Sequence, residues 1–222
     1  AGSSAASDVY KRQAVYVGTN EGAGIHTSDD GGETWTELKT GLPEGNMGKI
    51  GMAISPMNPD VLYATIETDN RKGGFYRSAD QGASWTKVSD EIGAGTGPHY
   101  YQEIFADQHQ FDRVYIASNY SKVSDDGGKT WTPINTKRKH VDDHAMAFHP
   151  TDPDFVLMGS DGGIYMSHDR MANWRFMANL PLTQFYKVAP DDSKPFYMIY
   201  AGAQDNSTPV SYTHLRAHET RL

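Results

Sequence analysis

The chain has 222 residues, carries 28 acidic against 20 basic side chains for a formal charge of −8, and contains no cysteine. The acidic balance argues against a nucleic-acid partner, because phosphate binding needs a basic surface, and the lack of cysteine excludes disulfides and thiolate chemistry. No apolar run approaches the roughly 20 residues that a membrane-crossing helix needs, and the 22 glycines, 13 tyrosines and 11 prolines are typical of short strands joined by turns.

The two ends of the chain differ from the rest. One codon spelling of DVYKRQ (Asp8 to Gln13) is GATGTGTATAAGAGACAG, and its reverse complement encodes VSYTH, which is Val210 to His214. A DNA element and its reverse complement at opposite ends resemble adaptor read-through in a metagenomic open reading frame. We therefore expect residues 1–13 and 210–222 to be non-native tails, and residues 14–209 to be an internal fragment of a longer protein.

Strand-like segments separated by turn signals follow one another from residue 14 to residue 203. Residues 14–39 contain three such segments, and residues 184–203 contain two. Between them, three units of four segments occupy residues 49–89, 101–135 and 144–179. The order predicts three complete four-stranded units with a partial unit on each side.

Each of the first four units carries a related octet. The octets read SDDGGETW, SADQGASW, SDDGGKTW and SHDRMANW, and their final tryptophans are 50, 46 and 43 residues apart. A period of 40–50 residues with several short strands per repeat is typical of β-propeller blades. We therefore predict an all-β fold, a partial β-propeller of four-stranded antiparallel blades. The repeated positions are Ser28, Asp30, Gly32 and Trp35; Ser78, Asp80, Gly82 and Trp85; Ser124, Asp126, Gly128 and Trp131; and Ser167, Asp169 and Trp174.

The octet is expected to form the turn between the third and fourth strands of a blade. Its aspartate can accept hydrogen bonds from the backbone of its own turn, and its glycine permits a positive φ. Its tryptophan can pack against a neighbouring sheet, because one blade cannot bury both faces alone. A calcium site is the alternative, but calcium needs six or more oxygen ligands and the turn is short.

The pattern S-x-D-x-G-x-[TS]-W resembles the Asp-box, or BNR repeat, of sialidases, xyloglucan-cleaving hydrolases and sortilin-type receptor propellers. The stretches HVDDHAMAFHPTDPDFVLMGSDGGIYMSHD, NLPLTQFYKVAPDD and YAGAQDNS look most like the sortilin-type and bacterial glycosyl-hydrolase-like group. The resemblance covers residues 14–209 and implies a secreted or periplasmic propeller. No sialidase-like arginine motif is present, so a sialidase site does not carry over.

Propeller topology predicts where a ligand binds. Connections from the fourth strand to the next blade and turns between strands two and three share one face, which collects most of the unusual polar and aromatic residues. Those tyrosines and amides have a structural alternative, as covers of sheet edges or caps of turns. The candidate ligand-binding residues are His99, Tyr100, Tyr101, Gln102, His140, Asp142, His144, Gln184, Tyr186, Gln204 and Asn206.

No cofactor or metal is expected. The stretch HVDDH is the most suggestive one for a metal, but in an extended strand His140 and His144 would lie about 13 Å apart. Zinc needs each nitrogen at about 2 Å.

Two functions remain open, and whether the protein is an enzyme stays undecided at this stage. The favoured one is recognition of a glycan, a peptide or a protein, with the remaining blades of the propeller as a further partner. The alternative is an Asp-box glycoside hydrolase acting on a polysaccharide, which needs two carboxyl groups about 5 Å or about 6.5–9.5 Å apart. Its candidate acids are Asp143, Asp161, Asp205 and Glu103.

Overall fold

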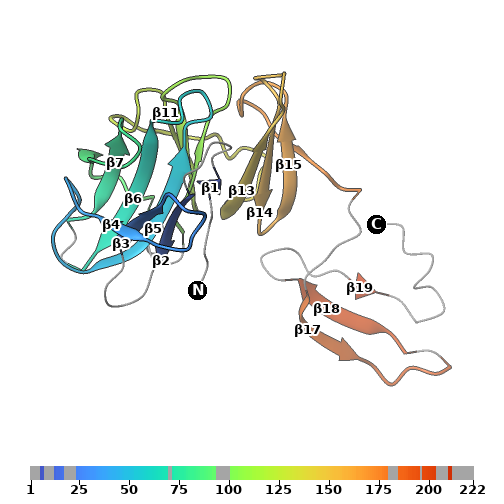
Figure 1. The fold of residues 1–222 in the computed structure, drawn as a ribbon. Helices are drawn as coiled ribbons and strands as arrows, with labels where there is room; N and C mark the ends of the chain where they lie inside the picture. Colours follow the sequence, from blue (N-terminus) through green and yellow to red (C-terminus); the bar gives the residue numbers. More distant parts are fainter. Residues whose placement is uncertain are drawn as a thin grey trace.

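The structure is a computed structural model that describes residues 6–7, 13–17, 24–69, 72–93, 101–179, 185–195, 197–203 and 210–211. Every regular element in these ranges is a β-strand, and neighbouring strands pair antiparallel in five small sheets (Figure 1). The predicted all-β fold of four-stranded antiparallel blades is thereby confirmed.

Within each sheet the strands follow chain order. The first sheet contains β1 (Ala6–Ser7), β2 (Gln13–Val17), β3 (Gly24–Ser28) and β4 (Thr36–Leu38). The second contains β5 (Met47–Ile54), β6 (Leu62–Thr68), β7 (Gly74–Ser78) and β8 (Thr86–Ser89). The third contains β9 (Glu103–Ala106), β10 (Val114–Ala117), β11 (Lys122–Ser124) and β12 (Thr132–Pro133).

The fourth sheet contains β13 (Asp143–Phe148), β14 (Val156–Ser160), β15 (Gly163–Ser167) and β16 (Arg175–Phe176). The fifth contains β17 (Phe185–Pro190), β18 (Ile199–Ala203) and β19 (Val210–Ser211). The second, third and fourth sheets are the three complete blades that the sequence predicts. The first sheet also includes the two-residue strand β1, and the fifth includes the two-residue strand β19. These strands lie in residues 1–13 and 210–222, which the sequence predicts to be non-native tails.

Hydrophobic side chains fill the spaces between consecutive sheets from the first to the fourth and form three separate cores. Strand β6 shows how the sequence arranges this, because successive side chains of a strand point to opposite faces. Leu62 and Ile66 face the first sheet, whereas Tyr63 faces the third. Strand β10 repeats the pattern, with Ile116 facing the second sheet and Tyr115 the fourth. A strand buried on both faces therefore reads as a nearly continuous apolar run.

Each later tryptophan of the repeat packs against the preceding sheet. The backbone amide of Trp85 donates to the Thr40 carbonyl at 2.9 Å, and the indole Nε1 of Trp174 donates to the Asn135 carbonyl at 2.7 Å. The Trp131 ring lies 5.0 Å from the Phe75 ring at 71°. Trp35, on the first sheet, is 40 % exposed.

The aspartates of the octets close their own turns. In the third sheet, Asp126 accepts hydrogen bonds from the Ser124 hydroxyl at 2.7 Å and from the backbone amide of Thr130 at 2.9 Å. The Ser124 hydroxyl also accepts from the Gly128 amide at 2.8 Å. The same pattern recurs around Asp30, Asp80 and Asp169.

The fourth octet has Met171 where the others have glycine, and it adopts the same turn. Met171 has a φ of 71°, compared with 95° at Gly128, and its amide donates to the Ser167 hydroxyl at 2.8 Å. A side chain at positive φ is strained. The Met171 side chain is buried in the core between the third and fourth sheets, and this apolar burial offsets the strain.

The fifth sheet stands apart from the other four in Figure 1. Val188 and Tyr200, on its two longest strands, are half exposed. Val188 pairs with Ala201 and Tyr200 pairs with Ala189, so these two exposed side chains lie on opposite faces of the sheet.

Substitution of Gly128 by alanine is expected to destabilise the protein by about 2–4 kcal/mol. A Cβ at Gly128, which has a φ of +95°, would lie 2.2 Å from Cδ1 of Phe75 in the second sheet. The matched control is Gly31→Ala, where φ is +79° and no atom lies within 4 Å of the added Cβ, so that only the backbone cost of about 1 kcal/mol remains. Denaturant unfolding measures both; equal losses would contradict the close contact between sheets.

Acid is expected to weaken the octet turns. Hydrogen bonds, first among them the one from the Thr130 side chain, lower the pKa of Asp126 to about 2, and the pKa values of Asp80 and Asp169 are lowered by the equivalent bonds. Because the folded pKa lies below the unfolded value of 3.8, the stabilisation is complete above that value and is lost as the pH falls through the folded pKa. Melting temperatures between pH 6 and pH 2 measure this loss, which should be smaller in Asp126→Asn.

Candidate functional site

Several predicted ligand-binding residues meet at one end of the third and fourth sheets. Tyr101 lies two residues before the start of β9, Asn119 lies in the β10–β11 turn, and Asp161 lies in the β14–β15 turn. The connection from β12 to β13 brings His140 and Asp142 to the same place. We call the following set the rim cluster: Tyr101, Asn119, His140, Asp142, His144 and Asp161.

Hydrogen bonds hold the carboxylate of Asp142 in the middle of the rim cluster. The Tyr101 hydroxyl donates to Asp142 Oδ1 at 2.9 Å. The Asn119 side-chain amide donates to the same oxygen and lies 3.3 Å from the Tyr101 hydroxyl. The Nδ1 atom of His140 lies 3.9 Å from Asp142 Oδ2. The third and fourth sheets are therefore joined by polar contacts at this end.

The second half of the rim cluster is a stacked pair of rings beside a carboxylate. The rings of Tyr101 and His144 lie 5.1 Å apart with an interplanar angle of 19°. His144 Nε2 lies 3.1 Å from Asp161 Oδ1, and these two side chains are 34 % and 31 % exposed. Tyr101 is 3 % exposed, so the ring of this pair that solvent reaches is that of His144. An exposed ring can stack on a sugar, and the carboxylate beside it can accept hydrogen bonds from the sugar hydroxyls.

Asp143 and its neighbour Asp142 lie in different environments. Asp143 is 1 % exposed, forms an ion pair with Lys139, and accepts a hydrogen bond from the Ser121 hydroxyl at 2.6 Å. Burial raises the pKa of Asp143 and the positive charge of Lys139 opposes the rise. Strand β13 begins at Asp143, and Asp142 before it has a φ of 62°. The change of backbone direction at Asp142 places one carboxylate at the rim and the other in the interior.

Gln102 and Glu103 take part in contacts between sheets. Gln102 is buried with a φ of 149°, and its side-chain oxygen accepts from the Thr65 hydroxyl at 3.4 Å. A Cβ on Gly51 would lie 1.8 Å from the Gln102 carbonyl, so β5 needs glycine where the backbone of residue 102 approaches. Glu103 forms an ion pair with Lys49 at 3.2 Å.

The remaining candidates lie outside the described residues. These are His99, Tyr100, Gln184, Gln204, Asp205 and Asn206, and the side chain of Tyr186 is not described either. Within the described ranges, no three His, Cys, Asp or Glu side chains are grouped so that they could hold a metal ion. The same ranges contain no helix long and apolar enough to cross a membrane.

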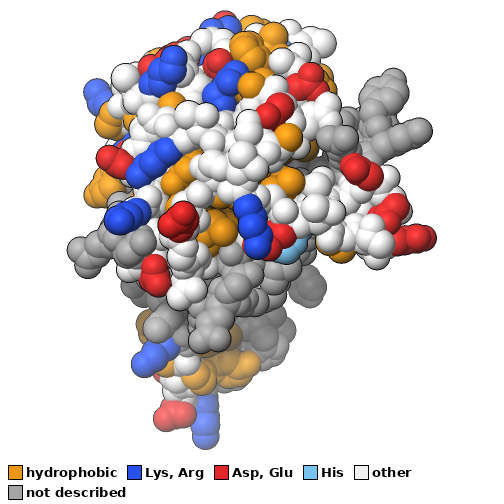
Figure 2. All heavy atoms as spheres, turned by 60° about the vertical axis from the view of Figure 1, so that its left-hand side comes forward, with side chains coloured by type: hydrophobic (Ala, Val, Ile, Leu, Met, Phe, Trp, Pro, Cys, Tyr) orange, Lys and Arg blue, Asp and Glu red, His pale blue; other side chains and the backbone are white. Residues whose placement is uncertain are grey.

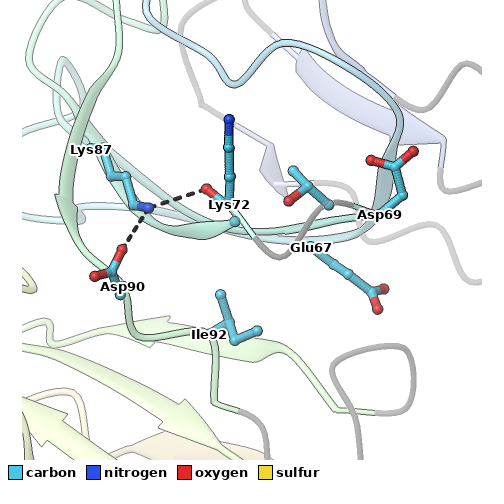
Figure 3. A pocket seen from close by; sticks show the side chains of 8 residues that line it. Glu67, Asp69, Lys72, Lys87, Asp90 and Ile92 are labelled. Carbon is cyan, nitrogen blue, oxygen red and sulfur yellow. Dashed lines mark hydrogen bonds and ion pairs between the residues drawn. The ribbon is translucent and has the colours of Figure 1, made fainter.

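A pocket of about 840 Å³ opens on the second sheet, at the same end as the rim cluster but away from it. Glu67 and Asp69 from the end of β6, Lys72 before β7, and Lys87 and Asp90 around the end of β8 line it (Figure 3). Lys87 Nζ lies 2.6 Å from Asp90 and donates to the Lys72 carbonyl at 3.1 Å. The pocket lining therefore carries charges of both signs. On the face of the molecule that Figure 2 shows, acidic and basic side chains are likewise interspersed.

No sequence motif singles out Asn119, Lys139 or the pocket residues. Asn119 lies in the segment SNYS and the pocket includes parts of ETDNRKGG. Both segments connect the second and third strands of a sheet, and the sequence predicts that such turns lie on this face. No periodicity marks the individual residues, because side chains in turns follow no repeat and their partners come from other sheets.

Comparison with known proteins places the fold in a family. The family model described as Sortilin-Vps10, "Sortilin, neurotensin receptor 3", matches residues 73–219, and the BNR/Asp-box repeat model matches residues 26–37. The chain belongs to the Sortilin-Vps10 family.

Curated relatives include xyloglucanases. The chain is 30 % identical over 209 residues to an oligoxyloglucan-reducing end-specific xyloglucanase of Emericella nidulans, covering 83 % of this chain and 25 % of that protein. It is 33 % identical over 184 residues to a xyloglucanase of Acetivibrio thermocellus, covering 71 % of this chain and 21 % of that protein. The chain thus spans a quarter or less of the relatives it matches.

Solved structures agree on the fold. A GH74 enzyme of Niastella koreensis matches with a TM-score of 0.61 at 18 % identity, over 89 % of this chain and 33 % of that one. The GH74 xyloglucanase of Xanthomonas campestris matches with a TM-score of 0.57 at 18 % identity, over the same shares of the two chains.

Replacement of Asp143 by alanine is expected to destabilise the protein by about 3–5 kcal/mol, because it leaves the ammonium of Lys139 buried without a partner. The control is Asp161→Ala, whose partly exposed contact with His144 contributes about 1 kcal/mol or less. Thermal melting of both variants measures the difference. A melting temperature of Asp143→Ala as high as that of Asp161→Ala would contradict the buried ion pair.

Proposed function

We propose that this chain is a propeller segment of a glycoside hydrolase that acts on a polysaccharide of the xyloglucan type. The observation that carries the proposal is the rim cluster, in which the Tyr101–His144 stack lies between the carboxylates of Asp142 and Asp161. The identity to xyloglucanases over most of this chain supports the same function. It favours the hydrolase, our alternative from the sequence, over the recognition module.

The residues of the rim cluster have distinct proposed roles. The partly exposed ring of His144, backed by the buried ring of Tyr101, would support a sugar ring. Asp142, fixed by Tyr101 and Asn119, would accept hydrogen bonds from the sugar hydroxyls. Asp161 is the proposed carboxyl group at the bond to be cleaved, since it is accessible and oriented by His144. Glycoside hydrolysis needs a second carboxyl group, a general base or nucleophile. Asp143 does not fit that role because the core encloses it.

A recognition propeller is the second candidate, and membership of the Sortilin-Vps10 family favours it. The same rim could bind a glycan or a peptide without turnover, since aromatic rings and amides suit both ligands. In either case the remaining blades of the propeller would be the partner that covers Trp35 and the exposed apolar side chains of the fifth sheet, Val188 and Tyr200. We also propose an extracytoplasmic location, where a polysaccharide substrate is accessible.

The test is hydrolysis of a panel of xyloglucan, mixed-linkage β-glucan, cellulose and xylan by the complete gene product that carries this segment. Release of reducing ends from xyloglucan is expected, and Asp161→Asn should lower kcat/KM by about a hundredfold or more if Asp161 is the general acid. The control is Asp152→Asn, which removes an exposed carboxylate from the β13–β14 turn at the opposite end of the fourth sheet.

Three results would decide between the candidates. Binding of xyloglucan without release of reducing ends would favour the recognition propeller. Neither binding nor hydrolysis would contradict both. Hydrolysis that Asp161→Asn leaves unchanged would keep the hydrolase and contradict the role of Asp161.

A further inference from the structure

The ion pair between Lys139 and Asp143 is the most enclosed one in the described part of the chain. Its side chains are 0 % and 1 % exposed, whereas the other described ion pairs leave both partners at least 10 % exposed. An enclosed ion pair adds little net stability, because desolvation offsets the attraction, and apolar residues of similar size fill such a space equally well. The effect of the Lys139–Asp143 ion pair therefore lies in the backbone and side chains that it holds in place.

The two residues anchor both ends of a short segment, residues 139–143, that leads from the β12–β13 connection into β13 and that we call the strap. Lys139 Nζ donates to the His140 carbonyl at 2.8 Å, and lies 5.8 Å and 5.5 Å from the ring centroids of Tyr165 and Trp174 in the fourth sheet. At the other end, the Asp143 amide donates to the Ser118 carbonyl at 3.0 Å. The ion pair therefore ties the strap to the fourth sheet and to the β10–β11 turn together.

Asp142 lies between these anchors in a conformation that needs outside support. Its φ is 62°, in the left-handed region that costs a side-chain-bearing residue free energy and persists where the surroundings impose it. Its amide donates to the Asn119 carbonyl at 3.3 Å, and its carbonyl accepts from the Asp161 amide at 3.2 Å. This conformation directs the carboxylate of Asp142 toward the Tyr101 hydroxyl.

The strap also packs closely against the β14–β15 turn. A Cβ on Gly162 would lie 2.4 Å from the Cβ of His140. The strap cannot shift toward Asp161 without a collision, and the ion pair keeps it from moving away. Both constraints act on the backbone that carries His140 and Asp142.

We propose that Lys139 and Asp143 are positioning residues, whose buried ion pair fixes the strap so that Asp142 and His140 complete the rim cluster. The pair touches no substrate and acts through Asp142. The expected effect on kcat/KM rests on the proposed function. The expected effect on hydrogen–deuterium exchange does not depend on any activity.

The test is the double variant Lys139→Met/Asp143→Leu in the complete gene product, which removes both charges and leaves neither partner buried alone. Hydrogen–deuterium exchange read by mass spectrometry should show the amides of residues 139–146 exchanging about tenfold faster or more, with the peptides of the second sheet unchanged. On xyloglucan, kcat/KM should fall about tenfold or more, while the melting temperature stays within a few degrees of the wild type.

The control variant is Arg77→Met, which breaks the ion pair between Arg77 and Asp112 that joins the second and third sheets at the opposite end. It should lower the melting temperature without faster exchange in residues 139–146. If the double variant fails to fold, Ser121→Ala, which removes one donor to Asp143, should give a smaller increase in exchange of the same peptide.

The results separate the two proposals. Unchanged exchange in residues 139–146 of a folded double variant would overturn the positioning role, whatever the activity. Faster exchange in a protein without activity on any polysaccharide would keep the positioning role and contradict the hydrolase. Faster exchange with unchanged kcat/KM would show that the strap does not serve catalysis, and would overturn the proposal.

Discussion

The contact on which this structure depends is the burial of apolar side chains between one small sheet and the next. A sheet of four short strands has two faces and cannot cover either, so each needs a neighbour on both sides. Strand β6 meets that need by alternating Leu62 and Ile66 with Tyr63, so that each face has its own core. Trp85 and Trp174 are buried against a preceding sheet, while Trp35 has none among the described residues and stays 40 % exposed.

The octet turns make this packing repeatable. Asp126 closes a turn from its own side chain, and Gly128 brings that turn against Phe75 of the preceding sheet. The turn and the packing thus support each other, because a residue with a Cβ at 128 would push the sheets apart. Met171 shows that the turn itself does not require glycine when its side chain can enter a core.

A fold built this way concentrates polar residues at the ends of the sheets, where connections from several blades converge. The rim cluster draws on four such connections, and its members satisfy one another across two sheets through Asp142 and Tyr101. Beneath it, Lys139 and Asp143 place two charges where apolar residues would fill the space. The same end of the second sheet holds a separate pocket lined by charges of both signs.

The sequence alone determined the three complete four-stranded sheets and the octet turns, because strand alternation, turn residues and a tryptophan repeat are local signals. It also determined the face on which Tyr101, His140, Asp142 and His144 lie, since connectivity fixes which end a turn occupies. Only the tertiary structure decided that Asp142 reaches the rim while Asp143 is buried with Lys139, and that Gln102 packs between sheets. The physical reason is that the partners of these residues, such as Asn119, Ser121 and Thr65, come from other parts of the chain. A shift of one residue along the backbone then decides whether a side chain lies in solvent or in the core.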